Sequence, residues 1–242
     1  MKNVIGNVKT LLRHLLPGTY QERLRCLFER YAITSYSQHG EDIIVRQILE
    51  NYRTGFYVDV GAYHPQQYSN TFYFYKKGWR GINIDARPGS MELFNRLRPR
   101  DINLEMAVSH TRQTLPYHGI SQPALNTFSK HAFNQHNSEE GYKVVFEKYI
   151  QTVPLSEILD QYLPEETEIE LLSIDVEGFE LSVLHSNNWE KYRPHVIIIE
   201  DLFFTVSKVN QSAVFSYLSN QGYTLIAKTP SNLIFIYQNV ED

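Results

Sequence analysis

The sequence has little cysteine, no long apolar run and no excess of positive charge, and each shortage excludes a class of protein. Cys26 is the only cysteine among 242 residues, so no internal disulfide can form, which fits a reducing compartment. No stretch approaches the roughly 20 apolar residues of a transmembrane helix, and the start lacks a signal peptide's apolar core. The net charge of −4 disfavours a broad nucleic-acid surface. We therefore expect a cytoplasmic protein that binds no nucleic acid.

Residues 1–36 differ in composition from the rest of the chain. Apolar residues recur at helical spacing over residues 4–16, with lysine and arginine between them, and a Pro-Gly pair ends the pattern. A second helix is expected at about 20–31. A basic amphipathic helix can lie on an anionic membrane, but it can also pack on the rest of the chain or on a second copy in a homodimer. We favour packing, and membrane contact stays open.

From residue 37 onward, short apolar runs alternate with amphipathic stretches. Strands are expected at 56–60, 79–85, 102–108, 170–175 and 195–201, followed by an antiparallel hairpin of 223–227 and 233–237. Helices are expected between them, including 88–97, 155–162 and about 211–221. This β-α-β-α-β order predicts an α/β fold with a doubly wound parallel sheet. Residues 109–150 interrupt the rhythm, with a possible hairpin of 114–118 and 124–128 and a polar loop at 130–141.

Four of the expected strands end in carboxylates, namely Asp59, Asp85, Asp175 and the pair Glu200 and Asp201. The carboxyl ends of parallel strands share one edge, which is where open α/β sheets bind their ligands. Like charges brought together there are costly unless a ligand supplies partners. S-adenosylmethionine offers a sulfonium, an amino group and ribose hydroxyls. A nicotinamide cofactor favours G-x-G-x-x-G, which the turn after residue 60 lacks, so an NAD(P)-dependent oxidoreductase is the weaker reading.

Four motifs in this order carry a family resemblance: Ser-Gln-His-Gly-Glu-Asp at 37–42, Val-Asp-Val-Gly-Ala at 58–62, Gly-Trp-Arg-Gly-Ile-Asn-Ile-Asp at 78–85 and Ile-Asp-Val-Glu-Gly-Phe-Glu at 174–180. With them the chain resembles the FkbM-type methyltransferases, a branch of the class I S-adenosylmethionine-dependent enzymes. The resemblance implies a Rossmann-like domain over residues 37–242, with seven strands, the last of them antiparallel. It implies methyl transfer to a hydroxyl of a sugar or natural product. Acceptor pockets in this fold come from the variable insert, here about 109–150, and from the N-terminal helices.

The resemblance also implies roles for individual residues. Asp59 and Gly61, with Ala62 beside them, would hold the methionine end of the cofactor, and Asp85 would bind the ribose hydroxyls. Further contacts with S-adenosylmethionine are expected from Glu41, Ala107, Val108 and Asp175. Ala107 and Val108 would flank adenine, where many class I enzymes place an acid.

A sugar hydroxyl is a poor acid, so its methylation needs a base or a metal ion. Asp175, Glu200 and Asp201 end two neighbouring strands, an arrangement similar to that of metal-dependent catechol-type O-methyltransferases, whose magnesium is held by acids at these strand ends. Oxygen ligands suit Mg²⁺ or Mn²⁺. Alternatively, Glu200 and Asp201 only cap a loop. Asp175, Glu177 and His64 are the candidates for a catalytic role, and His131 and His136 are further possible bases.

These observations predict an S-adenosylmethionine-dependent O-methyltransferase. Its acceptor would be a hydroxyl of a sugar, in a glycosylated metabolite or a surface glycan, activated by a side-chain base or by a divalent metal ion. A non-catalytic, cofactor-binding partner subunit is the alternative from a different class. The intact acids at the strand ends favour the enzyme.

Overall fold

The computed structural model describes residues 32–129 and 142–237. The chain divides into two units, Met1–Thr34 and Ser35–Asp242, and the description below concerns the second. The expected N-terminal helices and the polar loop that contains His131 and His136 lie outside the described residues. Within the described ranges, no helix has the length and apolar character needed to cross a membrane.

The main sheet has seven strands: β1 (Phe56–Val60), β2 (Arg80–Asp85), β3 (Ile102–Glu105), β7 (Leu171–Ile174), β8 (Val196–Glu200), β9 (Tyr223–Lys228) and β10 (Asn232–Tyr237). Their order is β3-β2-β1-β7-β8-β10-β9. β1 pairs in parallel with β2 and β7, whereas β10 runs antiparallel to both β8 and β9. The predicted Rossmann-like sheet with an antiparallel last strand is confirmed. The strand order reverses direction between β1 and β7, which makes the ends of these two strands the expected ligand site.

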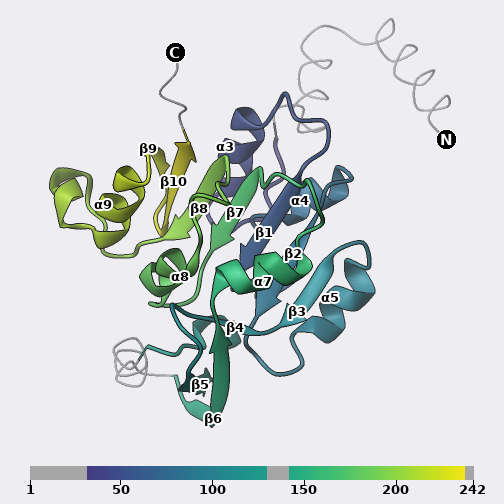
Figure 1. Cartoon of the computed structure of the whole chain (residues 1–242), viewed down its shortest axis with the longest axis vertical. Coiled ribbons are helices and arrows are strands. Elements are labelled where there is room, and N and C mark those ends of the chain that lie inside the picture. Colours follow the sequence, from purple (N-terminus) through teal and green to yellow (C-terminus); the bar gives the residue numbers. More distant parts are fainter. Residues whose placement is uncertain (1–31, 130–141, 238–242) are drawn as a thin grey trace, which may run out of the picture. The chain divides into compact units, whose positions relative to one another are not determined.

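Helices cover both faces of this sheet because its central strands are apolar on both faces. In β8, Ile197 and Ile199 pack toward α7 (Leu155–Tyr162), α8 (Glu180–Ser186) and α9 (Ala213–Asn220). Val196 and Ile198 of the same strand pack on the other face, with residues of α3 (Glu41–Ile48) and α4 (Phe72–Lys76). α5 (Met91–Leu97) packs against Ala62, just after β1. Figure 1 shows α7 and α8 on one side of the central strands.

A second, three-stranded sheet extends from the edge at which the parallel strands end (Figure 1). It consists of β4 (Ala107–Val108), β5 (Thr114–Ile120) and β6 (Val144–Val153), in the order β4-β6-β5. The expected strand at 102–108 is therefore two strands that belong to two sheets, with Met106 between them.

Two further predictions about local structure hold only in part. β5 pairs along its length with β6, and the expected hairpin with residues 124–128 is reduced to one antiparallel bridge between His118 and Thr127, because the chain after β5 folds back as the short 3₁₀ helix η1 (Pro123–Leu125). The Asn126 side chain accepts a hydrogen bond from the Ile120 amide and holds this turn. α5 begins at Met91 and not at Pro88, because Gly89 has a φ of +78°, which no right-handed helix contains.

Candidate active site

Asp59 faces the interior of the domain. Its side chain is buried and accepts a hydrogen bond from the Thr71 hydroxyl at 2.7 Å. Burial raises the pKa of Asp59, while the Thr71 hydrogen bond and the Arg98 guanidinium oppose that rise. The Asp59 carboxylate therefore binds the loop that follows β1 through Thr71. It does not line either of the two cavities at this edge of the sheet.

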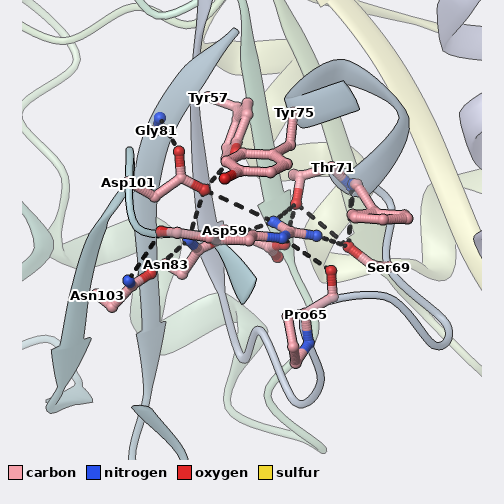
Figure 2. A network of polar contacts seen from close by, with 12 residues as sticks. Tyr57, Asp59, Pro65, Ser69, Thr71, Tyr75, Gly81, Asn83, Asp101 and Asn103 are labelled. Atoms are coloured by element: carbon pink, nitrogen blue, oxygen red, sulfur yellow. Dashed lines mark hydrogen bonds and ion pairs between the residues drawn. The ribbon is translucent and has the colours of Figure 1, made fainter. Parts of the chain in front are cut away.

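Arg98 compensates the charge around Asp59. Its side chain is fully buried, directly after α5. It donates hydrogen bonds to the Pro65 carbonyl (2.8 Å), Ser69 (2.7 Å), Thr71 (2.8 Å) and Asn83 (3.1 Å). Asp101 completes the network, 4.0 Å from the guanidinium and accepting a hydrogen bond from the Tyr57 hydroxyl. Figure 2 shows these polar side chains gathered around one point. The network ties the loop after β1 to α5 and β2.

The end of β1 requires a glycine. Gly61 has a φ of +83°, and a Cβ at this position would collide with the carbonyl oxygen of Asp175. Next to it, the Asp85 carboxylate accepts hydrogen bonds from the amides of Tyr63 (2.9 Å) and Arg87 (2.8 Å). Burial raises the pKa of Asp85, and the Arg87 amide counteracts the rise. These contacts fix the position of Asp85, which lines a cavity together with Gly61 and Asp175.

This first cavity lies over the ends of β1, β2 and β7. Its remaining walls come from apolar residues after β3, including Met106 and Val108, and from the insert. The enclosed space measures about 60 Å³, well below the roughly 300–1,000 Å³ of typical small-molecule sites. It is narrow because η1 and Phe128 lie across it, with Phe128 packed between Tyr117 and Phe179. A nucleoside-sized ligand therefore requires this part of the insert to shift.

Three carboxylates converge beside the first cavity. Asp175, Glu177 and Glu200 each offer an oxygen, and the three oxygens lie within 4.8 Å of one another. Burial, reinforced by mutual repulsion, raises the pKa of Asp175 to about 7 and that of Glu177 to about 9. The pKa of Glu200 is raised for the same reasons. In the described part of the chain, no donor forms a hydrogen bond with the carboxylates of Asp175 and Glu200. We call these three residues the acid cluster.

The predicted metal-binding set was Asp175, Glu200 and Asp201, and the structure groups Glu177, not Asp201, with the first two. The Asp201 carboxylate accepts hydrogen bonds from the Ser212 hydroxyl (2.6 Å) and the Phe203 amide (3.2 Å). Ser212 in turn caps α9 by accepting a hydrogen bond from the Phe215 amide at 2.9 Å. Asp201 therefore shapes the loop between β8 and α9, while Glu177 takes its place in the acid cluster.

Glu177 sits in a turn that is held from two sides. Its φ is +54°, in the left-handed region, which for a residue with a side chain costs on the order of 1 kcal/mol. The Glu180 carboxylate accepts hydrogen bonds from the amides of Val176 (3.1 Å) and Gly178 (3.0 Å). From the insert, the Thr127 hydroxyl donates to the Glu177 carbonyl oxygen at 2.7 Å. These contacts hold the strained turn that carries the Glu177 carboxylate into the cluster.

A second, larger cavity begins on the other side of Glu177. It measures about 580 Å³ and is lined by Glu177, Glu180, Glu200 and the loop between β8 and α9. Within residues 32–129 and 142–237, Glu177 is the one residue that lines both cavities. A ligand in the first cavity and a ligand in the second would therefore meet at the acid cluster.

His64 lies apart from this meeting point. Its Nδ1 accepts hydrogen bonds from the amides of Gln66 (3.1 Å) and Gln67 (2.9 Å), so in the neutral ring the proton is on Nε2. Burial lowers the pKa of His64, with a further contribution from Arg87. The ring lines neither cavity. The structure thus gives His64 the role of ordering the loop after β1.

Glu41 also has a structural position. It is fully buried and accepts hydrogen bonds from the Thr229 hydroxyl (2.6 Å) and the Asn232 amide group (3.1 Å), which tie α3 to the turn between β9 and β10. Among the residues expected to bind the cofactor, the first cavity is lined by Gly61, Asp85, Val108 and Asp175, and not by Glu41, Asp59, Ala62 or Ala107. Ala62 packs against α5, and Ala107 is buried in β4.

Three important residues were missed by sequence reasoning. Arg98 gave no signal, because an arginine at the end of a helix ordinarily faces solvent. Thr127 gave none either, since its partner is far away in the sequence. Glu180 carried a usable signal: an acid at the start of an expected helix, just after a glycine, commonly accepts hydrogen bonds from exposed backbone amides.

Comparison with known protein families finds a match over the part of the chain that carries both cavities. Residues 59–225 match the model of the Methyltransferase FkbM domain. The match begins within β1 and extends into β9, so it includes the strand ends that carry Asp85, Asp175 and Glu200. No curated protein matches the chain. The family match covers more than half of the sequence, and this protein therefore belongs to the FkbM methyltransferase family.

Proposed function

We propose that this protein is an S-adenosylmethionine-dependent O-methyltransferase whose acceptor is a hydroxyl of a sugar, in a glycosylated metabolite or a surface glycan. The observation that supports this most is the meeting of two cavities at the acid cluster. Methyl transfer needs a donor and an acceptor in line, and a hydroxyl acceptor must also lose its proton. Carboxylates at the meeting point are suited to receive that proton.

The residues of the first cavity fit S-adenosylmethionine. The Asp85 carboxylate is fixed by two backbone amides, and a carboxylate so held can accept hydrogen bonds from two adjacent ribose hydroxyls. Met106 and Val108 offer an apolar wall to adenine. Gly61 leaves the backbone open to close approach. When bound, the cofactor supplies a methyl group made electrophilic by the sulfonium.

The acid cluster fits a divalent cation. Three carboxylates that repel one another match the hard oxygen ligands that Mg²⁺ and Mn²⁺ prefer. Asp175, Glu177 and Glu200 would hold the ion, which would lower the pKa of a hydroxyl bound beside it. Without an ion, the raised pKa values of Asp175 and Glu177 keep protons on the cluster near neutral pH. Glu177, which lines the second cavity, is the residue placed to accept the acceptor's proton in the fraction of the protein in which its carboxyl is ionised, and that fraction increases as the pH approaches about 9.

Calorimetry with S-adenosylhomocysteine, in Mg²⁺ and in EDTA, tests the cofactor and the ion separately. We expect micromolar binding of S-adenosylhomocysteine and transfer of a labelled methyl group to glycoside acceptors. Glu200→Gln should abolish the effect of Mg²⁺, while Asp201→Asn, a change in the adjacent acid outside the cluster, should retain it. Cofactor binding without any methyl transfer would favour the partner-subunit alternative, and no binding by folded protein would contradict both.

A further inference from the structure

We propose that the loop between β8 and α9, residues 201–212, forms the acceptor site, and that this site takes an uncharged glycoside and rejects acceptors with a phosphate or carboxylate near the reacting hydroxyl. This inference rests on the proposed function and specifies its substrate class. It differs from the expectation that the insert and the N-terminal segment form the acceptor pocket. The argument uses the position, the charge and the apolar rim of the second cavity.

The position of the second cavity is that of an acceptor site. Its volume of about 580 Å³ lies within the roughly 300–1,000 Å³ range of small-molecule sites. It meets the first cavity at Glu177 and extends from there along the loop to the first residues of α9. Among the described residues of the insert, Ser129 alone lines it. An acceptor in this space would have its hydroxyl at the acid cluster and its body against the loop.

The walls of the second cavity are acidic. Four acids line it, namely Glu177, Glu180, Glu200 and Asp201, whereas Lys208 is the one basic residue among the described residues that line it. An anionic group on the acceptor would therefore approach several acids, most of them half-buried, whose ionised forms repel it. Neutral sugar hydroxyls, by contrast, can donate hydrogen bonds to the same carboxylates. The charge of the site thus selects against phosphorylated sugars and uronic acids.

The loop also presents an apolar surface beside the acids. Leu202 and Phe203 line the cavity, yet 54% and 76% of their surfaces are exposed. The Phe203 amide is fixed by its hydrogen bond to Asp201, which is itself bound to Ser212, so the ring stands on an ordered turn. An aromatic ring next to hydrogen-bond acceptors suits a molecule with a C–H face and a polar edge, which describes a sugar ring. Phe203 is therefore the residue we expect to contact the acceptor's apolar face.

Val206 provides a matched control. It lies in the same loop and is 73% exposed, but it does not line the cavity. Because both side chains are mostly exposed, neither Phe203→Ala nor Val206→Ala should disturb folding. A difference between the two variants in acceptor binding would report on the cavity and not on the general apolar character of the loop.

Saturation-transfer NMR of the full chain with S-adenosylhomocysteine and EDTA, so that no divalent ion neutralises the acids, tests the inference, with the methyl glycosides of a hexose, a deoxyhexose and the corresponding hexuronic acid as probes. We expect a neutral glycoside to bind at least about tenfold more tightly than the uronic acid. Phe203→Ala should weaken that binding about tenfold, and Val206→Ala should leave it unchanged. Equal or tighter binding of the uronic acid, or no difference between the variants, would overturn the inference.

Calorimetry with S-adenosylhomocysteine on the same samples separates the two proposals. If the cofactor product binds but no glycoside does, the acceptor inference fails and the methyltransferase proposal stands. If S-adenosylhomocysteine does not bind to folded protein, the methyltransferase proposal fails. In that case glycoside binding that depends on Phe203 would still identify the second cavity as a sugar site.

Discussion

Two groups of carboxylates lie in the main domain, one around Arg98 and the other at the carboxyl edge of the main sheet, and they differ in how their charge is compensated. Asp59 and Asp101 surround Arg98, which also binds the neighbouring hydroxyl and amide groups. Asp175 and Glu200, at the ends of the next two strands of the sheet, have no such cation or hydrogen-bond donor among the described residues. Because a buried charge without a partner is costly, the first group is complete as part of the fold and the second is complete only with a ligand.

The comparison explains why acids at strand ends are ambiguous in a sequence. Asp59 is the next-to-last residue of β1 and Asp175 directly follows β7, so both lie at the end of a buried strand, yet the protein supplies a cation to one and not to the other. The compensated acid supports the loop after β1, whereas the uncompensated acid belongs to the cluster where the cavities meet. The predictions below remove the cation from the first group, or change the charge or the position of the carboxylates in the second.

The largest effect is expected from removing Arg98. Arg98→Met leaves Asp59 and Asp101 buried without a cation, which should lower the free energy of unfolding by about 3–5 kcal/mol. Urea denaturation followed by circular dichroism measures this. Arg100→Met is the control, because Arg100 is exposed and contacts the Tyr75 ring and carbonyl. Similar losses in both variants would mean that the buried network contributes little.

Neutralising the acid cluster should have the opposite effect on stability. Burial and the neighbouring acids raise the pKa of Glu200, so at about pH 8 folding requires this group to take up a proton. Glu200→Gln removes that requirement and should raise the free energy of unfolding of metal-free protein by about 1 kcal/mol. The same change should reduce methyl transfer about 100-fold, because a group that acts on the acceptor's proton is disturbed. Denaturation and a methyl-transfer assay on one sample measure both. A destabilised Glu200→Gln variant would show that the cluster is compensated after all.

The stability of metal-free protein should depend on pH through the acid cluster. The pKa values of Asp175 and Glu177 are raised to about 7 and about 9 in the fold. In the unfolded chain these pKa values are the ordinary ones, about 4. Proton binding therefore favours the native state, and this contribution is lost progressively as the pH rises from about 4 through the folded-state values. We expect a decrease of about 1–2 kcal/mol between about pH 6 and pH 9.

Thermal melting across this pH range measures the effect, and saturating Mg²⁺ should remove most of it. Asp175→Asn should flatten the dependence, and Asp59→Asn should not, because the Asp59 charge is compensated by Arg98. A decrease with pH that is the same in all three proteins would assign it to other groups.

The smallest effect is expected at Thr127. Thr127→Val removes the hydrogen bond to the Glu177 carbonyl and should lower kcat about tenfold, with a loss of stability of about 1 kcal/mol. Thr127→Ser keeps the hydroxyl and should restore most of the activity. If Thr127→Ser is as slow as Thr127→Val, the hydroxyl does not position the turn.

Much of the fold follows from local sequence patterns, while the site depends on contacts that those patterns do not contain. Alternating apolar strands and amphipathic helices define the seven-stranded sheet. Glu200 and Asp201 are adjacent, and successive side chains at the end of a strand point to opposite sides, so one reaches the cluster and the other the α9 cap. Residues 114–120 pair with residues 144–153, which lie more than 20 residues further along the chain. The sequence near 114–120 does not show whether its partner strand is this distant segment or the next short segment at 124–128.

Manganese binding tests the central claim most directly, since Mn²⁺ free in solution gives an electron paramagnetic resonance signal that is lost on binding. Titration of the wild-type chain should show one bound ion per chain near neutral pH. Glu200→Gln should lose that ion, whereas Asp59→Asn, a change of the same size in the compensated group, should keep it. No bound ion, or equal binding by all three proteins, would contradict the assignment of the acid cluster as the part of the site that a ligand completes.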